Sequence, residues 1–291
     1  MKFLILQDIP VNQPVENFCI ARGLERAFWR SGFNAHAENT LTLHLIDDDK
    51  WKMLSSHFDA LLITQNYFLE HINYVKEFKG LKIFWSIDSH KDFENHAKFI
   101  LDNKIDIALV SSYSYVSQFK EKGINAFWFP NCYPSDLITP TNFQNRPIQL
   151  GFCGSRSNRG EWIDKLKNEC NLHTAINVCA EKMVNELYSY KIGWNRNEAD
   201  DINFRTFEMM GAGCLLLTNE TPGITKLFKN VCYSEYNTYN WCIDKIKKYS
   251  EHEKERLEIA INGYNEVRKN HSYDSRVVDL IKIIETGEGT L

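Results

Sequence analysis

The stretch NFRTFEMMGAGCLLLTN, residues 203–219, carries a charged pair on a short run with helical character. Arg205 and Glu208 are three residues apart, so they would share one face of a helix. Arg205 falls in the first turn, where a cation opposes the helix dipole, and a bound anion would remove that conflict. Glu208 could accept hydrogen bonds from vicinal hydroxyl groups such as those of a ribose. A local Arg–Glu surface pair is the plainer alternative.

A second candidate is GFCGSRSNRGEW, residues 151–162, where an apolar run meets a glycine turn before a helix. Gly154 would let the backbone approach a ligand closely, and a helix N-terminus favours an anion. Ser155, Arg156 and Arg159 follow, and the two guanidinium groups suit phosphate oxygens. The pattern is neither GxGxxG nor a Walker loop. A glycine turn with solvated arginines remains the alternative.

A third candidate lies in the first half of the chain, in FWSIDSHKD, residues 84–92. Asp88 and His90 directly follow an apolar run, and the histidine could act as a base or hydrogen-bond a sugar hydroxyl. Alternatively, Asp88 or Ser89 caps the next helix and His90 is a surface residue. The acidic triplet at 47–49 precedes a helical run, so we interpret it as an acidic first turn and expect no metal site.

Alternating strands and helices position these residues. Strands are expected at 2–7, 59–64, 81–87, 105–112, 124–130, 148–154, 174–178, 192–195, 214–218 and 231–235. Helices are expected at 17–31, 67–78, 90–103, 114–122, 159–169, 181–191, 203–211, 222–228 and over most of the chain after 238. Continuous apolar runs are typical of parallel strands buried on both faces. Ligands of such sheets bind beyond the carboxyl ends of the strands, where the three candidates fall.

The two series of strands and helices are separated by residues 131–147, which contain three prolines and no periodicity. We interpret this segment as a linker. The pattern therefore predicts an α/β protein with two Rossmann-like, doubly wound domains that face a cleft. We place the first domain at 1–140 and the second at 141–272.

Composition narrows the class of protein. The chain has 291 residues, 43% hydrophobic and 25% charged, as is ordinary for a globular protein. The net charge of -4 provides no basic field, which disfavours a nucleic-acid partner. No apolar run is long enough to span a bilayer, and the start lacks the features of a signal peptide. The eight cysteines have no CxxC spacing, so we expect reduced thiols in a cytoplasmic protein.

Several of these motifs together resemble the GT-B glycosyltransferases of the family 4 kind, especially the CgeB-like "glycosyl transferases group 1" subset. The segment DINFRTFEMMGAGCLLLT is similar to the family's donor-site pattern, Arg-x-Phe/Tyr-Glu-x-x-Ala-x-Gly followed by a leucine-rich strand. LGFCGSRSNR, TPGITKLF and HSYDSR also match the subset. The resemblance covers residues 80–291 well, and residues 1–80 only by general pattern.

The resemblance assigns roles to individual residues. Glu208 matches the second glutamate of the family's Glu-x7-Glu motif, which binds the donor ribose, and the place of the first falls on Asp200. Arg159 and Arg205 fall where basic residues meet the donor diphosphate. His90 resembles the first-domain histidine near the donor sugar, and we pair it with Asp88 as the catalytic candidates. The remaining donor-binding candidates, which flank these positions, are Gly154, Ser155, Arg156, Asn195, Asn203 and Phe204.

The resemblance implies transfer of a sugar from a nucleotide-diphosphate sugar, UDP- or GDP-linked, to an unidentified glycan, lipid-linked glycan, protein or small molecule. It implies a retaining hexosyltransferase that needs neither a metal nor a cofactor, because arginines and helix termini can stabilise the departing diphosphate. A C-terminal helix at 273–291 is expected to cross back to the first domain. The family's Glu-Gly-Phe-Gly loop is replaced by ADDINF. A nucleotide-sugar-binding or assembly protein without transfer activity, and a sugar-nucleotide epimerase, stay open as alternatives.

Overall fold

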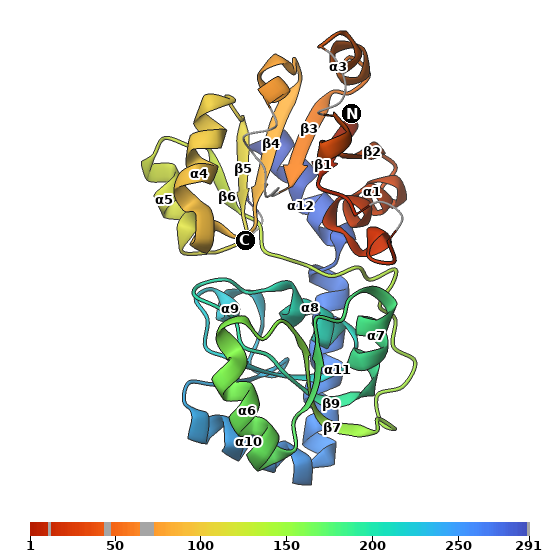
Figure 1. Ribbon diagram of the computed structural model, residues 1–291, viewed down its shortest axis with the longest axis vertical. Coiled ribbons are helices and arrows are strands. Elements are labelled where there is room, and N and C mark those ends of the chain that lie inside the picture. The colour runs from red at the N-terminus through yellow and green to blue at the C-terminus, as the bar shows by residue number, and fades with distance from the viewer. Residues whose placement is uncertain (11–12, 44–47, 65–72, 290–291) are drawn as a thin grey trace. The chain divides into compact units, whose positions relative to one another are not determined.

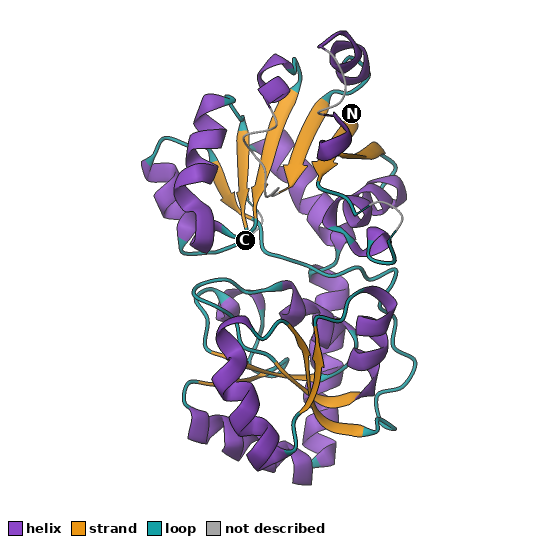
Figure 2. Cartoon of the chain, in the orientation of Figure 1, coloured by secondary structure: helices purple, strands orange, loops and turns teal. Residues whose placement is uncertain are grey.

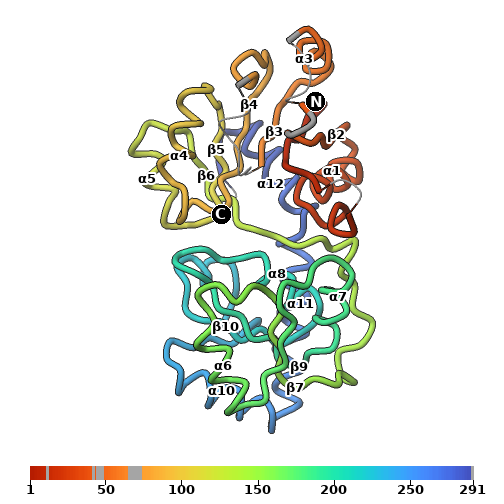
Figure 3. Tube along the Cα trace, in the orientation of Figure 1, coloured from red at the N-terminus to blue at the C-terminus, as the bar shows by residue number. Residues whose placement is uncertain are grey.

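The computed structural model describes residues 1–10, 13–43, 48–64 and 73–289, and the chain forms two compact units. Unit 1 contains Met1–Pro130 and Tyr273–Leu291, and unit 2 contains Asn131–Ser272. Unit 2 is therefore inserted in the sequence between the two parts of unit 1, and the chain path can be followed in Figure 3.

The core of unit 1 is a parallel sheet with the strand order β2-β1-β3-β4-β5-β6 (Figure 2). Its strands are β1 (Lys2–Gln7), β2 (Asn34–Asn39), β3 (Ala60–Thr64), β4 (Leu81–Ser86), β5 (Ile107–Val110) and β6 (Ala126–Trp128). The inner strands are apolar on both faces and almost fully buried, as parallel strands covered by helices must be. Their carboxyl ends share one edge of the sheet, which is where β4 delivers residues 87–90.

The helices of unit 1 come from both parts of the sequence. They are η1 (Glu16–Phe18), α1 (Ile20–Arg30), α2 (Thr40–Leu43), α3 (Asp48–Ser55), η3 (Asn73–Glu77), α4 (Ser89–Asp102), α5 (Tyr115–Glu121) and α12 (Tyr273–Thr286). The last helix packs on the first (Figure 1). Gly23 makes this possible, since a Cβ there would lie 2.5 Å from the Tyr273 ring. Arg30 adds an ion pair to Asp274, with Nε 2.7 Å from Oδ1.

Unit 2 has a five-stranded parallel sheet with the order β11-β10-β9-β7-β8. Its strands are β7 (Ile148–Gly154), β8 (His173–Ile176), β9 (Tyr190–Trp194), β10 (Leu215–Asn219) and β11 (Ser234–Tyr236). Its helices are η4 (Ser157–Arg159), α6 (Gly160–Cys170), α7 (Ala180–Ser189), α8 (Phe204–Gly211), α9 (Ile224–Leu227), α10 (Tyr239–Glu251) and α11 (Glu253–Asn270). The prediction of two α/β sheets is confirmed. The loops after β7 and β9 meet at one edge because these strands are neighbours.

β2 was not predicted from the sequence. Two other predicted segments lie partly outside the described residues. β2 is an edge strand that buries only Ala35 and Ala37 on its inner face, so it shows no apolar run. Of the helix expected at 67–78, residues 67–72 lie outside the described part of the chain, and Asn73–Glu77 form the 3₁₀ helix η3. Residue 47 of the acidic triplet also lies outside it, whereas α3 begins at Asp48.

The proline-containing segment 131–147 belongs to unit 2, and its first four residues are buried. Arg146 is buried and donates from Nη1 to Tyr190 O at 3.0 Å and from Nη2 to Ala212 O at 2.6 Å. A Cβ on Gly211 would meet the Tyr133 ring at 2.4 Å, so this glycine lets the segment approach the end of α8 closely. The segment therefore fixes the C-terminal end of α8.

Candidate functional site

The loop after β7 carries the site residues that were predicted in the stretch 151–162. Ser155 and Arg156 are exposed, and Arg156 forms a bidentate pair with Asp164, with N–O distances of 3.0 and 2.7 Å. Arg156 is therefore held on the surface of α6, where such a pair contributes little to stability. Its predicted role in donor binding would require the guanidinium group to leave Asp164.

Arg159, at the end of the same loop, is held from the opposite side by the loop after β9. Its Nε donates to Arg196 O at 2.7 Å, and its Nη1 lies 2.7 Å from Glu198 Oε1. The Arg159 side chain is 13% exposed. Burial is the main cause that lowers the pKa of Arg159, and the charge of Glu198 opposes it. Arg159 is thus a partly desolvated cation with a fixed orientation.

Three guanidinium groups gather at this edge of unit 2. Arg196 and Arg205 both lie close enough to Arg159 for their charges to lower its pKa further. Arg205 Nη1 is 3.0 Å from Glu208 Oε2, and these two side chains are 17% and 14% exposed. Of these arginines, Arg159 is paired with Glu198 and Arg205 is paired with Glu208. An anion bound here would relieve the repulsion between the arginines.

The pairing of Arg205 with Glu208 is the plainer arrangement considered for these residues. The pair does not exclude ligand binding, because the Nη1 of Arg205 makes no well-aligned hydrogen bond within the described part of the chain. The contact with Glu208 is therefore an ion pair in which the N–H groups of Arg205 Nη1 are not aligned with the carboxylate. Both side chains keep a small exposed surface, through which a ligand could reach Arg205 and Glu208.

A buried amide and hydroxyl network fixes the loop that carries these charges. Asn203 is the N-cap of α8, and its Oδ1 accepts a hydrogen bond from Thr206 N at 3.2 Å. Asn195 is 1% exposed and donates from Nδ2 to Thr206 Oγ1 at 3.1 Å and to Asn197 Oδ1 at 3.1 Å. Asn195 thus supports the loop in this structure. Asp200 is half-buried in the same loop, and Phe204 is the first residue of α8.

Arg196, Glu198 and Trp162 were not singled out in the sequence. The guanidinium carbon of Arg196 lies 4.3 Å from the centroid of the Trp162 ring, which suits a cation–π contact. The signal for Arg196 and Glu198 was their place directly after β9 within NRNE. Trp162 lies on α6, two residues past the helix start, and its spacing alone is typical of a core residue.

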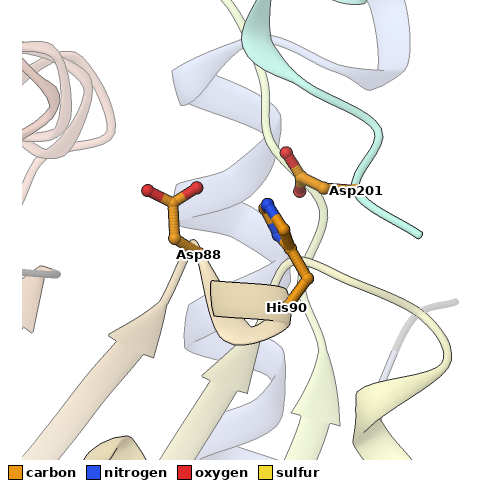
Figure 4. A group of neighbouring side chains, drawn as sticks. All are labelled: Asp88, His90 and Asp201. Atoms are coloured by element: carbon orange, nitrogen blue, oxygen red, sulfur yellow. The ribbon is translucent and has the colours of Figure 1, made fainter. Parts of the chain in front are cut away.

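In unit 1, Asp88 and His90 lie at the carboxyl end of β4 and the start of α4 (Figure 4). The side chain of Asp88 makes no capping hydrogen bond, which removes the capping alternative for that residue. Ser89 is fully buried, and its Oγ lies 2.6 Å from Ser86 Oγ, which in turn lies 2.8 Å from His96 Nδ1. This chain of contacts anchors the turn that presents His90. Asp201, also labelled in Figure 4, belongs to the loop before α8 in unit 2.

Burial favours the neutral form of His96. Desolvation is the main cause that lowers the pKa of His96, and Asp92 and Asp88 oppose it. The backbone of Asp92 is not helical, with φ -139° and ψ 34°, so the first turn of α4 is set off from the rest of the helix. His96 therefore acts in this structure as a hydrogen-bond partner of Ser86 beneath that turn.

Comparison with known proteins agrees with this organisation. Residues 141–282 match the family model described as "Glycosyl transferase-like". A search of curated proteins finds no significant match. Among the helices of the described part of the chain, none has the length and apolar character needed to cross a membrane.

Solved structures of low sequence identity share the fold over nearly the whole chain. Anabaena HepE in complex with UDP and glucose superimposes with a TM-score of 0.67 at 9% identity, covering 98% of this chain and 100% of that one. Sucrose-phosphate synthase from Thermosynechococcus elongatus gives 0.69 at 9% identity, covering 98% of each chain. The T4 phage BGT in complex with UDP and Mn²⁺ gives 0.63 at 12% identity, covering 97% of this chain and 99% of that one. The expected fold class is confirmed: the chain has the GT-B fold, and its residues 141–282 are similar to the glycosyl transferase-like family.

Proposed function

We propose that the protein transfers a sugar from a nucleotide-diphosphate sugar to an acceptor, and that unit 2 binds the donor. The observation that carries the proposal is the cluster of Arg159, Arg196 and Arg205 at the carboxyl edge of the unit 2 sheet. Two of these arginines were predicted from sequence to meet the diphosphate. The cluster lies within the part of the chain that matches the glycosyltransferase family.

Arginines are suited to this step because the leaving diphosphate gains negative charge as the sugar departs. A preorganised cation stabilises that charge without moving, and partial burial strengthens the interaction. Arg159 is oriented by Arg196 O and Glu198 before any ligand arrives. We therefore propose that no metal or cofactor is required. The T4 phage protein, in contrast, was solved with Mn²⁺.

Glu208 is proposed to bind the ribose hydroxyls once the diphosphate has drawn Arg205 away. The donor is proposed to be UDP-linked, with GDP next, since HepE and the T4 phage protein were solved with UDP. Asp88 and His90 in unit 1 are proposed to act on the transferred sugar, with retention of configuration. The net charge of -4 disfavours a nucleic-acid acceptor, and the eight free thiols suit a cytoplasmic enzyme.

A binding protein without transfer activity is the second candidate, because Asp200 replaces a longer carboxylate of the family motif. Nucleotide binding to unit 2 can be measured before the acceptor is known. We expect UDP to raise the melting temperature of the wild type more than CDP or dTDP does. Arg205→Ala should abolish this shift. Arg268→Ala, which removes an exposed arginine of α11, should leave it unchanged. Equal shifts for the two variants would contradict the assignment of the donor site.

A further inference from the structure

A cavity of about 400 Å³ lies along β11, the outer strand of the unit 2 sheet, and the proposed donor chemistry does not use it. Its walls come from the loop after β10, from β11 and from one face of α10. The volume falls within the range of roughly 300–1,000 Å³ that is usual for small-molecule sites. All lining residues belong to unit 2, so the cavity is complete within that unit.

Buried polar atoms in the cavity wall have no protein partner. Ser234 is 4% exposed and Tyr233 is 3% exposed, and neither hydroxyl makes a hydrogen bond to any described residue. Glu235 Oε1 is buried without a hydrogen bond in the same wall. Leaving such groups unsatisfied costs free energy, and a polar ligand that hydrogen-bonds to them would recover it.

The remaining lining groups define the kind of ligand. Trp241 is 46% exposed and Lys245 Nζ lies 5.7 Å from the centre of its ring, so an aromatic face with a hydrogen-bond donor borders the opening. Glu220 and Asn237 add a carboxylate and an amide. Hydroxyl, amide and carboxylate groups beside an aromatic ring suit a ligand that has hydroxyls around an apolar ring.

The charges in the cavity argue against a phosphate-bearing ligand. Burial is the main cause that raises the pKa of Glu235, and the nearby charge of Glu220 raises it further. Two carboxylates face a single cation, Lys245, so a phosphate or a uronate would meet net repulsion. An uncharged polyol has hydrogen-bonding capacity without that penalty.

We propose that the cavity bounded by Glu220, Ser234, Glu235, Trp241 and Lys245 binds an uncharged pyranose sugar, at a place distinct from the nucleotide site. The sugar packs one ring face on Trp241 and donates hydroxyl protons to Glu220 and Glu235. Ser234 and Tyr233 complete its hydrogen bonds. The proposal does not depend on transfer activity, because a binding protein of the same fold would also carry this site.

Saturation-transfer NMR on the full chain tests the proposal with glucose, galactose, mannose and N-acetylglucosamine, each compared with glucuronate. We expect at least one neutral sugar to bind, with glucuronate weaker. Trp241→Ala and Ser234→Ala should each weaken binding roughly tenfold, as loss of a packed ring or one hydrogen bond predicts. Trp29→Ala, at an exposed tryptophan of unit 1, should change nothing.

Two controls separate this site from the donor site and from a folding defect. Ser234→Ala removes a hydroxyl without a partner, so the melting temperature of the free protein should stay the same or rise. Sugar binding should persist in Arg159→Ala and in the presence of saturating UDP. Comparing glucose with maltotriose then distinguishes a free sugar from the end of a neutral glycan. The proposal is overturned if no sugar of the panel binds, if Trp241→Ala binds as the wild type does, or if UDP displaces the sugar.

Discussion

Arg159 offers the sharpest test of the proposed anion site, the cluster of Arg159, Arg196 and Arg205. Two of the three guanidinium nitrogens of Arg159 already have protein partners. Nε is bonded to Arg196 O and Nη1 is paired with Glu198, at 2.7 Å each. Among the described residues, Nη2 donates no hydrogen bond. We therefore expect Nη2 to bond to the diphosphate. One hydrogen bond between charged groups contributes roughly 1.5–3 kcal/mol, which corresponds to a loss of about 10- to 150-fold in affinity.

The assay compares UDP with uridine by isothermal titration calorimetry, for the wild type, Arg159→Ala and Arg159→Lys. The alanine variant should lose the predicted affinity for UDP and keep its affinity for uridine, which has no phosphate. The lysine variant should be intermediate, because it keeps the charge and loses the planar fork. Arg159→Ala also leaves Glu198 without its ion-pair partner. The melting temperature of each free protein measures the effect of that loss on stability. Equal losses for UDP and uridine would refute the assignment of Arg159 to the diphosphate.

Four further outcomes are expected. Glu208→Gln should weaken UDP binding and have little effect on 2′,3′-dideoxy-UDP, and an equal effect on both in calorimetry would make Glu208 only a partner of Arg205. Activity should survive EDTA, and activity lost on chelation and restored by Mn²⁺ or Mg²⁺ would count against a metal-independent reaction. Asn203→Ala should reduce the free energy of unfolding by about 1 kcal/mol, measured in urea, because the cap on Thr206 N is lost. Since burial lowers the pKa of His96 below its ordinary 6.5, the contribution of His96 to stability should be constant above about pH 6.5 and fall at lower pH, where the unfolded chain gains the proton first. A melting-temperature profile for His96→Gln that falls as steeply as that of the wild type would exclude this cause.

The inner strands could be predicted from the sequence because their burial on both faces leaves continuous apolar runs. β3 is buried over its whole length, and β1 is buried at its four central residues. β2 could not be predicted in the same way, because an edge strand built from NAHAEN needs only two alanines on its inner face. Its place is set by pairing with β1, which is a tertiary contact.

The sequence predicted which loops form the candidate site. It did not predict which groups each arginine contacts. Strand-end positions located Arg159 and Arg205, because parallel strands bring their carboxyl ends to one edge. Which group each arginine contacts depends on how the loops fold over one another. Arg156 is paired along α6 with Asp164, and Arg159 is held by the backbone of Arg196. No local pattern in the sequence distinguishes these two arginines.

Cleavage of a nucleotide-diphosphate sugar at the arginine cluster of unit 2 can be followed by proton NMR. The wild type and Arg159→Ala would be incubated with UDP-glucose, and then with other UDP- and GDP-sugars. We expect the wild type to release the nucleoside diphosphate from one donor, with the sugar first appearing as the anomer present in the donor. Release should be strongly reduced in Arg159→Ala. Donor binding without release, or release that is equal in the two proteins, would show that the arginine cluster does not carry the proposed reaction.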